Sequence, residues 1–448
     1  MALAEKELLL RLLSGWYFTA GIEYGLFFSS ILSRLVDDIG AHQSLFAYVL
    51  AVFPLAGALL AALIGKQTDK RGSIDLTIVF GLVSSILGNL IYCFATSGNY
   101  IILARFVSGV GNAIDGAIMG FAGRTVLPAE RGATFARLLV YKQFGTISCP
   151  AWVLISKKFI KPKLLPDVST NIIFAGVVTA FWMLVLLGAL YVFYVRKITF
   201  PRPYSATLAV QLESSDATNL SSSLADENKS TVQTADKNIP FKILPSYINE
   251  PFVVANIVVF SSIFLQASNE TLVTPFNKSY FGWGTSQNSL EFMMIGLCAL
   301  FGYMVAKFLM AAKETGSRVE PKNVFGAGIG GCAFVCFFTA VVIAFASFRA
   351  IWVYTCIAIS IFIFCITFPL TLVSSASIIA KNTPEEYQSF TQSIRVASEK
   401  IAQVLAPLWV GGLLPADTNG MKGFLIMAPS ILFFMFTSTA LNSVWQYL

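Results

Sequence analysis

Twelve apolar segments of about 20 residues recur along this 448-residue chain, and each is long enough to cross about 30 Å of hydrocarbon as a helix. Hydrophobic residues make up 56% of the chain and charged residues only 12%, whereas charged residues are about 25% of a typical soluble domain. Most of the chain must therefore face lipid or other membrane helices. The sequence predicts an all-α membrane protein whose transmembrane helices begin near Gly15, Ser44, Leu76, Tyr100, Thr134, Asn171, Phe252, Gln287, Asn323, Ile351, Phe390 and Gly423.

A polar interval separates the first six apolar segments from the last six. Residues 201–249 are rich in Ser, Thr, Asn, Asp and Lys, and such a composition cannot bury a hydrophobic core. We therefore expect a largely disordered linker there. The predicted organisation is a cytoplasmic N-terminus (1–14), an N-terminal six-helix bundle (15–196), a cytoplasmic linker (197–250) and a C-terminal six-helix bundle (251–448).

The basic residues favour one side of the membrane. Most of the 31 lysines and arginines fall in the N-terminus, the linker and the loops on their side, which predicts that both termini are cytoplasmic. The loop containing Lys157 and Lys163 departs from this rule, so either it attracts anions or the flanking helices are misplaced. The net charge of +7 is not clustered on a soluble domain, and this argues against a nucleic-acid partner.

The residue types that most enzymes and metal sites need are scarce. All seven cysteines lie in apolar segments and are interpreted as small buried hydrophobic residues. The single histidine, His42, lies in a short loop, and Cys332 and Cys336 have no partner pair nearby that would complete a metal site. We predict no enzymatic activity, no metal and no cofactor.

Residues 65–73 form a charged turn between the second and third apolar segments. Gly65 and Gly72 permit close approach and a sharp turn, Asp69 can cap a helix, and Lys70 and Arg71 add the positive charge typical of a cytoplasmic surface. The turn resembles the signature of the major facilitator superfamily, Gly-x-x-x-Asp-[Arg/Lys]-x-Gly-[Arg/Lys], with a serine in place of the last basic residue. The resemblance implies twelve helices in two pseudo-symmetric bundles.

The same resemblance implies a gating role for Asp69. In the superfamily this aspartate meets the positive end of a helix from the other half together with an arginine, which in this chain would be Arg124 or Arg131. The attraction to a helix end is worth about 0.3–1 kcal/mol at an exposed site and up to about 2 kcal/mol when partly buried. A solvated surface turn without a gating role is the alternative.

Two further motifs resemble elements of the superfamily. Arg105 begins the pattern Arg-x-x-x-Gly-x-Gly in the fourth span, and an arginine in hydrocarbon needs water, an anion or a carboxylate; Arg105 is thus a candidate ligand, unless it snorkels to the nearby outer surface. Gly145 and Pro150 resemble the antiporter element Gly-x-x-x-Gly-Pro, with a cysteine replacing the second glycine. Pro150 and its counterpart in the second half, Pro407, are expected to bend their helices.

Other charged residues inside the predicted spans are candidate ligands for a substrate or an ion. Glu23 and Glu270 are membrane carboxylates that can carry protons. Asp115 lies near the middle of its span, so it must pair with a basic residue, exchange a proton or line a cavity. The repeat between the halves places Lys142 opposite Glu399, as a gate or a charge-compensated site, although both side chains are also able to reach the membrane surface.

Short motifs resemble a narrower branch of the superfamily, the lysosomal branch linked to the seventh form of neuronal ceroid lipofuscinosis. The motifs are Glu130-Arg131 and the run that begins at Glu270 and reads Glu-Thr-Leu-Val-Thr-Pro. At Gln403 that branch tends to carry arginine, so its ion or substrate preference need not transfer. The resemblance implies an endosomal or lysosomal membrane rather than the plasma membrane.

Two short patterns concern sorting and modification. Glu5, Leu9 and Leu10 fit an acidic dileucine signal for a sorting adaptor, or simply an amphipathic start to the first helix. Asn277 lies near the outer end of the seventh span and is the best candidate for a glycan.

The sequence predicts a secondary active transporter that moves a small organic solute or anion by alternating access, with proton coupling as an option. A chloride channel on the same fold is the main alternative, because Arg105, Lys142 and the loop from Lys157 to Lys163 would suit chloride and because the chain resembles the lysosomal branch. A membrane scaffold or receptor is a third. The expected partners are the solute or ion and membrane lipid, and the oligomeric state is left open.

Overall fold

The computed structural model describes residues 2–33, 45–159, 170–195, 250–313, 316–317, 319–345 and 351–413, and nearly all of them are helical. The predicted linker from 201 to 249, the loop containing Lys157 and Lys163 from residue 160 onward, and the twelfth predicted span near Gly423 lie outside the described residues. The remaining eleven spans correspond to described helices.

The N-terminal half begins with a helix that is longer than predicted. Its elements are α1 (Ala2–Ser33), α2 (Leu45–Arg71), α3 (Asp75–Cys93), α4 (Gly98–Gly111), η2 (Asn112–Ile114), α5 (Asp115–Arg124), η3 (Pro128–Glu130), α6 (Arg131–Phe159) and α7 (Thr170–Val195). The fourth predicted span is therefore not one regular α-helix, because the 3₁₀ turn η2 separates α4 from α5. A 3₁₀ stretch inside a helix often marks a functional or strained position, and here it immediately precedes Asp115.

The C-terminal half repeats the pattern of long helices. Its elements are α9 (Glu250–Phe281), α10 (Thr285–Leu309), β1 (Ala312–Lys313), β2 (Gly316–Ser317), α11 (Pro321–Phe345), α12 (Ile351–Lys381), η4 (Glu385–Tyr387) and α13 (Gln388–Leu413). The two strands form a short antiparallel hairpin. This hairpin is a small departure from the predicted all-α fold and lies in the loop between α10 and α11.

Seven of the described helices are long and apolar enough to cross a membrane by length and composition. They comprise α2, α3, the combined fourth span, and parts of α9, α10, α11 and α12. In contrast, α13 carries buried polar and charged side chains along much of its length, including Gln388, Gln392, Arg395 and Lys400. Its polar face is directed into the protein, which makes α13 the element to follow in search of a functional site.

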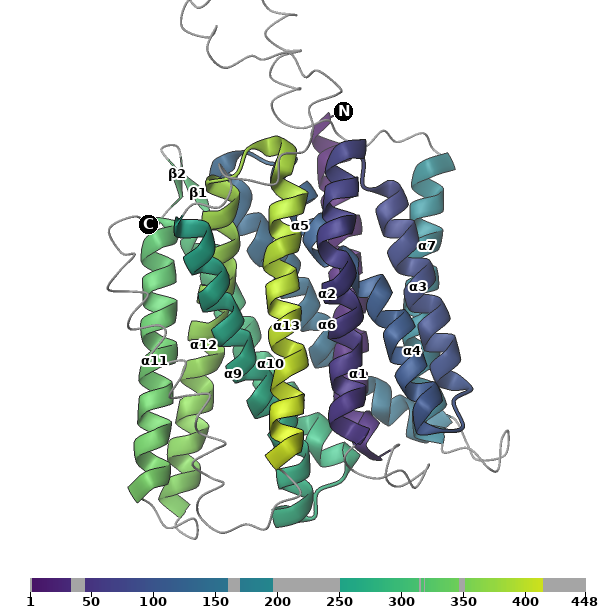
Figure 1. Cartoon of the computed structure of the whole chain (residues 1–448), viewed down its shortest axis with the longest axis vertical. Coiled ribbons are helices and arrows are strands. Elements are labelled where there is room, and N and C mark those ends of the chain that lie inside the picture. The colour runs from purple at the N-terminus through teal and green to yellow at the C-terminus, as the bar shows by residue number, and fades with distance from the viewer. Residues whose placement is uncertain are drawn as a thin grey trace, which may run out of the picture.

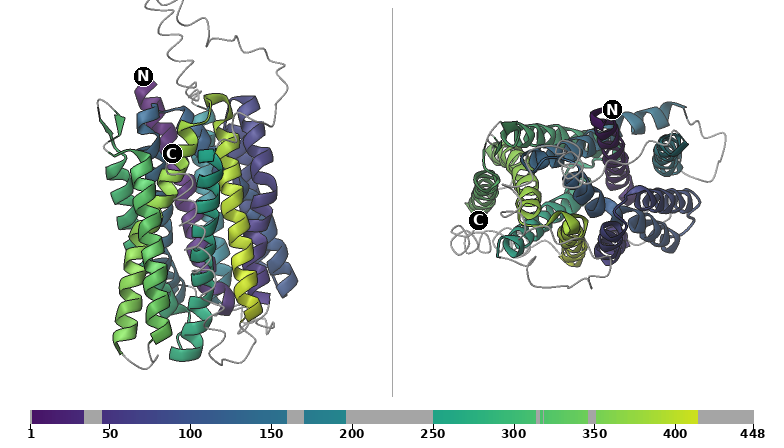
Figure 2. Two further views of the ribbon diagram at one scale, coloured as in Figure 1. Left: turned by 60° about the vertical axis from the view of Figure 1, so that its left-hand side comes forward. Right: turned by 90° about the horizontal axis from the view of Figure 1, so that it is seen from above.

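The helices run side by side, with the first half of the chain on one side of the molecule and the second half on the other (Figure 1). In both the side view and the view from above, α13 lies beside α2, although the two helices are far apart in the sequence (Figures 1 and 2). A second seam joins α6 to α10. The two halves therefore meet along two seams, α13 against α2 and α5, and α6 against α10.

Small residues allow α13 to approach the N-terminal half closely. A methyl group added at Gly65 on α2 would lie 2.6 Å from the backbone oxygen of Ser389, and one added at Gly116 on α5 would lie 2.8 Å from the backbone nitrogen of Ser393. Both distances are too short for a carbon atom to be accommodated without movement. These glycines therefore set the separation of the halves along this seam, Gly65 at the predicted cytoplasmic side and Gly116 deeper in the protein.

The predicted helix bends concern α6 and α13. Both helices continue through Pro150 and Pro407, so neither proline ends its helix, and bending there stays a prediction. Gly145 allows close helix packing instead, because a side chain at this position would clash with the backbone of α1 near Phe18 and Ile22. It brings α6 against α1 within the N-terminal half.

Candidate functional site

Buried charged side chains occur at two levels along the seam between α2, α5 and α13. The first level lies on the side predicted to be cytoplasmic, and we call it the cytoplasmic contact; it consists of Asp69, Arg124, Ser389 and Phe390. The second, the central contact, consists of Asn112, Asp115 and Lys400. Because α13 rises about 1.5 Å per residue, Lys400 lies about 16 Å deeper along the helix than Ser389, roughly halfway across the hydrocarbon.

In the cytoplasmic contact, Asp69 on the last turn of α2 faces the start of α13. Its carboxylate accepts hydrogen bonds from the backbone N–H of Ser389 at 3.2 Å and of Phe390 at 2.7 Å. Arg124 lies 3.3 Å away and also donates to the Ser389 hydroxyl at 3.2 Å. Free N–H groups and the helix dipole both favour a carboxylate at a helix N-terminus.

This arrangement places Asp69 where the resemblance predicted it, and the arginine beside it is Arg124. Arg131 makes a separate bridge between the halves: it donates to the carbonyl oxygen of Ala380 at 2.9 Å and lies 3.5 Å from Glu385. The solvated surface turn considered from the sequence does not describe Asp69, whose side chain is 3% exposed. The gating role itself stays a prediction.

The rest of the predicted gating motif shapes and surrounds the turn. Gly72 adopts a φ of 68°, and its N–H bonds to the carbonyl oxygen of Thr68 at 3.0 Å. This is the left-handed conformation that glycine supplies after a helix end. Lys70 and Arg71 are exposed and make the turn basic, as expected of a cytoplasmic surface.

Within the N-terminal half, Arg105 on α4 reaches inward to Glu23 on α1. The two side chains lie 3.4 Å apart, and Ser108 also donates to the Glu23 carboxylate. The guanidinium of Arg105 lies 4.2 Å from the ring of Phe27 and 4.1 Å from that of Phe53, within the range of cation–π attraction. Arg105 is only 6% exposed, so it does not snorkel to the membrane surface.

In the central contact, Asp115 at the start of α5 has partners from both halves. From its own half, Trp16 donates its indole N–H to Asp115 Oδ1 at 2.7 Å. From the other half, Lys400 Nζ lies 3.8 Å from Asp115 Oδ2 and donates to the side-chain oxygen of Asn112. Asp115 therefore pairs with a basic residue, one of the three possibilities left open by the sequence.

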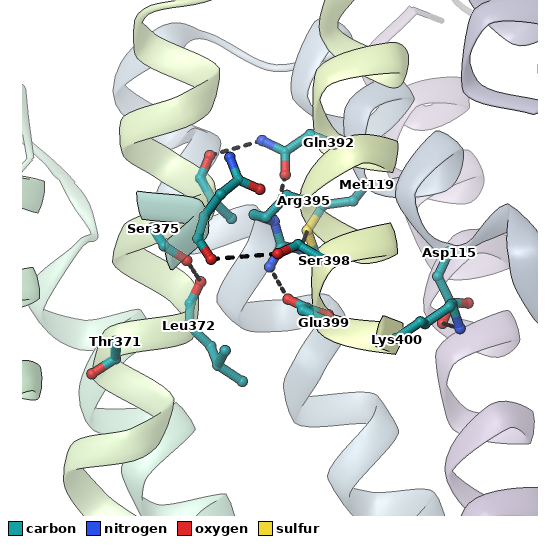
Figure 3. A network of polar contacts seen from close by, with 12 residues as sticks. Asp115, Met119, Thr371, Leu372, Ser375, Gln392, Arg395, Ser398, Glu399 and Lys400 are labelled. Atoms are coloured by element: carbon teal, nitrogen blue, oxygen red, sulfur yellow. Dashed lines mark hydrogen bonds and ion pairs between the residues drawn. The ribbon is translucent and has the colours of Figure 1, made fainter. Parts of the chain in front are cut away.

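Figure 3 shows Lys400 extending from α13 toward Asp115, and Arg395 with Glu399 on the same helix. Arg395 forms an ion pair with Glu399. It also donates hydrogen bonds to the side-chain oxygen of Gln392 at 2.9 Å and to the Met119 sulfur at 3.0 Å. This pair is internal to α13, and within the described part of the chain its one hydrogen bond to the N-terminal half is from Arg395 to the Met119 sulfur.

The predicted pairing of Lys142 with Glu399 is wrong. Glu399 pairs with Arg395, and no ion pair joins Lys142 to Glu399 in the described part of the chain. The physical reason lies in the two seams: α6, which carries Lys142, packs against α10, whereas α13 packs against α2. Equivalent positions in the two halves therefore lie on different seams and do not face each other.

Glu270 on α9 makes a further contact between the halves. The Tyr24 hydroxyl on α1 donates to Glu270, and Gln266 on α9 donates to the same carboxylate at 2.8 Å. Glu270 thus lies on the C-terminal side of a contact between α1 and α9, close to the predicted outer end of α9.

Sequence reasoning missed Lys400 and Arg395. Both are almost fully buried, at 4% and 2% exposure. The available signal was the set of three charges, Arg395, Glu399 and Lys400, inside one apolar span. The repeat between the halves indicates only Glu399 as a site residue, because Glu399 matches Lys142.

The two sorting and modification patterns occupy packed positions. Leu9 and Leu10 are 1% and 5% exposed within the core between α1 and its neighbours. Asn277 is 4% exposed, and its amide donates to the side chains of Asn288 and Glu291. Neither the dileucine pair nor the amide is displayed at the surface in this conformation.

Among the described residues, no group of three or more His, Cys, Asp or Glu side chains is arranged to hold a metal ion. The polar chemistry of the two contact levels is confined to carboxylates, amides, hydroxyls and permanent or near-permanent cations. Such a set binds ions and polar solutes and transfers protons between carboxylates and water.

Comparison with known proteins connects this geometry to one family. The human organic anion transporter MFSD10 (TETRAN) is 11% identical, with a TM-score of 0.65 over 97% of this chain and 99% of its own. The proton:xylose symporter XylE, solved with 6-bromo-6-deoxy-D-glucose, is 14% identical, with a TM-score of 0.70 over 100% and 96%. The transporter FucP in its outward conformation is 13% identical, with a TM-score of 0.61 over 96% and 98%.

At these identities the likeness shows the fold alone. No curated protein sequence matches the chain significantly. The sequence profile of the Major Facilitator Superfamily, however, matches residues 13–407, which is most of the chain and includes both contact levels. This integral, multi-pass membrane protein therefore belongs to the Major Facilitator Superfamily.

Proposed function

We propose that this protein is a secondary active transporter that moves a small organic solute or anion by alternating access. The observation that carries the proposal is the division of the buried charges into two kinds. Glu23 with Arg105, and Arg395 with Glu399, are ion pairs inside one half. The Asp69 and Asp115 contacts instead join one half to the other.

This division suits two halves that rock against each other. Pairs inside a half keep their partners throughout such a motion, so they impose no cost on it. Contacts between the halves must break and reform, and they set the balance between the two conformations. A buried charge that loses its partner must gain water, a substrate or a proton, and this links the motion to binding.

Proton coupling is assigned to Glu23. Its carboxylate is buried beside Arg105 and Ser108, so protonation would release the arginine without moving the backbone. Glu270 is the second candidate, because it is held only by Tyr24 and Gln266 and has no cation within ion-pair distance in the described chain.

Solute flux into liposomes containing the purified protein tests the function, measured with and without a proton gradient. We expect saturable flux and stimulation by unlabelled solute on the opposite side. Glu23→Gln should keep this exchange but lose its response to the gradient, whereas Glu320→Gln, at an exposed loop position, should behave as wild type. If the gradient response survives in both Glu23→Gln and Glu270→Gln, neither carboxylate carries the coupling.

A chloride channel on the same fold is the second candidate, supported by the buried cations Arg105, Arg395 and Lys400. It predicts a current that grows with voltage, does not saturate and is insensitive to solute on the opposite side. Against it, each of these cations already has a carboxylate partner. A current of that kind would exclude the carrier mechanism.

We place the protein in endosomal or lysosomal membrane, on the resemblance to the lysosomal branch and the motif of Glu5, Leu9 and Leu10. Because both leucines are packed in the core, an adaptor would require the first turns of α1 to unwind. Imaging of Glu5→Ala tests the sorting role, since substitution of the leucines would also damage packing. A mobility shift on enzymatic deglycosylation, absent from Asn277→Gln, tests the proposed glycan.

A further inference from the structure

Lys400 is the one buried cation at the central contact, and both of the side chains that it bonds belong to the opposite half. Its ammonium reaches Asn112 and Asp115, both in the N-terminal half. Among the described residues it forms no hydrogen bond or ion pair within its own half. The neighbouring carboxylate on α13, Glu399, is already paired with Arg395.

Asp115 is not dependent on Lys400 in the same way. Trp16 donates to one oxygen of its carboxylate at 2.7 Å, and the Tyr17 hydroxyl donates to the backbone carbonyl oxygen of Asp115 at 3.0 Å. Both forms of stabilisation come from the same half. If the halves separate at this level, Asp115 keeps its partners in the N-terminal half, whereas Lys400 loses both of the side chains that it bonds.

The Lys400 side chain packs closely against α2, but its ion pair with Asp115 is long. Its stem passes over Gly57 on α2, where an added methyl group would lie 2.6 Å from Lys400 Cδ. The charged atoms themselves are 3.8 Å apart, longer than the 2.7–2.9 Å of a strong charge-assisted hydrogen bond. A competing anion therefore has to replace only a weak ion pair between Lys400 and Asp115.

From this asymmetry we propose that Lys400 is the residue that binds the negative group of the substrate, and that the substrate is an organic anion carrying a carboxylate. The substrate replaces Asp115 as the counter-ion of Lys400 when the central contact opens. This inference rests on the proposed transport function and deepens it by naming the substrate class and the residue that selects it. Asp115 acts as the competitor that occupies the lysine when no substrate is bound.

The test measures thermal stabilisation of the purified full-length protein in chloride-free buffer by matched probes. Sodium benzoate and sodium gluconate are compared with their neutral isosteres benzamide and gluconamide, and with benzylammonium as the cation. We expect the two carboxylates alone to raise the Tm of the wild type. Asp115→Asn, which removes the competitor, should respond at about tenfold lower carboxylate concentration. Lys400→Gln should not respond, and Lys307→Gln, at an exposed position on α10, should respond as wild type.

A double variant separates binding from folding. Lys400→Gln alone leaves Asp115 without its buried cation, so it is expected to be less stable. Asp115→Asn combined with Lys400→Gln removes both charges and should restore the Tm, yet still fail to respond to carboxylates. A double variant that regains the carboxylate response would show that the lysine has only a structural role and would overturn the proposal.

Several results would overturn the assignment without touching the carrier mechanism. These are an equal response to the amides or to benzylammonium, an equal response to chloride, a carboxylate response that survives Lys400→Gln, and no response to any probe in wild type and Asp115→Asn. Saturable flux of gluconamide in liposomes would then show a carrier of neutral solutes. A current that does not saturate with any probe would instead reject the carrier mechanism itself.

Discussion

The cytoplasmic and central contacts both hold α13 against the N-terminal half through an aspartate, but they are built differently. Asp69 is met by two backbone N–H groups and an arginine, at distances of 2.7–3.3 Å. Asp115 is met across the seam by a single lysine at 3.8 Å. The first contact uses atoms whose positions are fixed by the helix, and the second uses the end of a flexible side chain.

This difference indicates separate tasks for the two levels. Backbone donors at a helix end cannot turn toward another partner, so the cytoplasmic contact is either made or broken, as a gate requires. A lysine ammonium can rotate and exchange one anion for another, as a binding group requires. Under the proposed function, the cytoplasmic contact would therefore set the balance of conformations, and the central contact would exchange ligands.

The largest effect is expected from Asp69→Asn. The substitution removes the charge that the end of α13 and Arg124 stabilise, an attraction worth up to about 2 kcal/mol, which corresponds to about a 30-fold change in the ratio of two conformations. We expect transport to fall by at least tenfold with little loss of protein abundance, and cysteines placed at the cytoplasmic side to become more reactive.

Asp75→Asn is the matched control for this prediction. Asp75 lies six positions further on, in the first turn of α3, and among the described residues it forms no hydrogen bond or ion pair with the C-terminal half. Its substitution should leave transport unchanged. Parallel losses of transport and abundance in Asp69→Asn would show a role in folding and would remove the distinction between the two levels.

A bulky residue at Gly65 should open the same gate by steric force rather than by charge. Gly65→Val places carbon atoms against the Ser389 backbone, and overpacking of this kind costs about 1–3 kcal/mol. We expect a lower Tm and increased labelling of cytoplasmic cysteines. Gly188→Val on α7 is the control, since a side chain there meets nothing within 4 Å. Unchanged labelling in Gly65→Val would mean that the seam is loose.

The sequence predicted the cytoplasmic contact better than the central one, and the reason is physical. The turn that carries Asp69 follows from local rules, since a tight turn with glycines and a charged end leaves a short sequence pattern, and the resemblance to the superfamily implied its contact with a helix end of the other half. The lengths of the apolar segments also predicted where most helices lie. They did not predict the hairpin at β1 and β2 or the 3₁₀ turn η2, because each of these interrupts the pattern for only a few residues.

The central contact depends on which helices face each other, and a single sequence does not contain that information directly. The repeat between the halves relates α6 to α13, but related helices occupy equivalent places on different seams. Lys142 and Glu399 were therefore paired wrongly, and Lys400, one residue further along, was overlooked. Its significance is visible only once α13 is placed beside α2 and α5.

A smaller effect at the central contact should follow from Trp16→Phe. The substitution removes the N–H that Trp16 donates to Asp115 at 2.7 Å, and an unpaired buried acceptor costs about 1–3 kcal/mol. Asp115 should then hold Lys400 more strongly, so the concentration of benzoate needed to stabilise the protein should rise severalfold. Trp182→Phe is the control, because its indole N–H has no hydrogen-bond partner in the described structure. A lower benzoate requirement in Trp16→Phe would contradict competition between Asp115 and the substrate.

The smallest effect concerns an ion pair that lies away from both contacts and should therefore alter stability without altering transport. In the predicted cytoplasmic N-terminus, hydrogen bonds from Arg137 lower the pKa of Glu7, and both lie in the N-terminal half. Because the pKa is lower in the folded state, the stabilisation is complete above the unfolded value of about 4.3 and is lost as the pH falls through the folded value. Glu7 is 43% exposed, so the pair is worth less than about 1 kcal/mol. Glu7→Gln should lower the Tm slightly at pH 7, and the difference from wild type should disappear as the pH falls through the lowered pKa of Glu7. Flux should be unchanged, and a loss of flux would mean that gating also involves this pair.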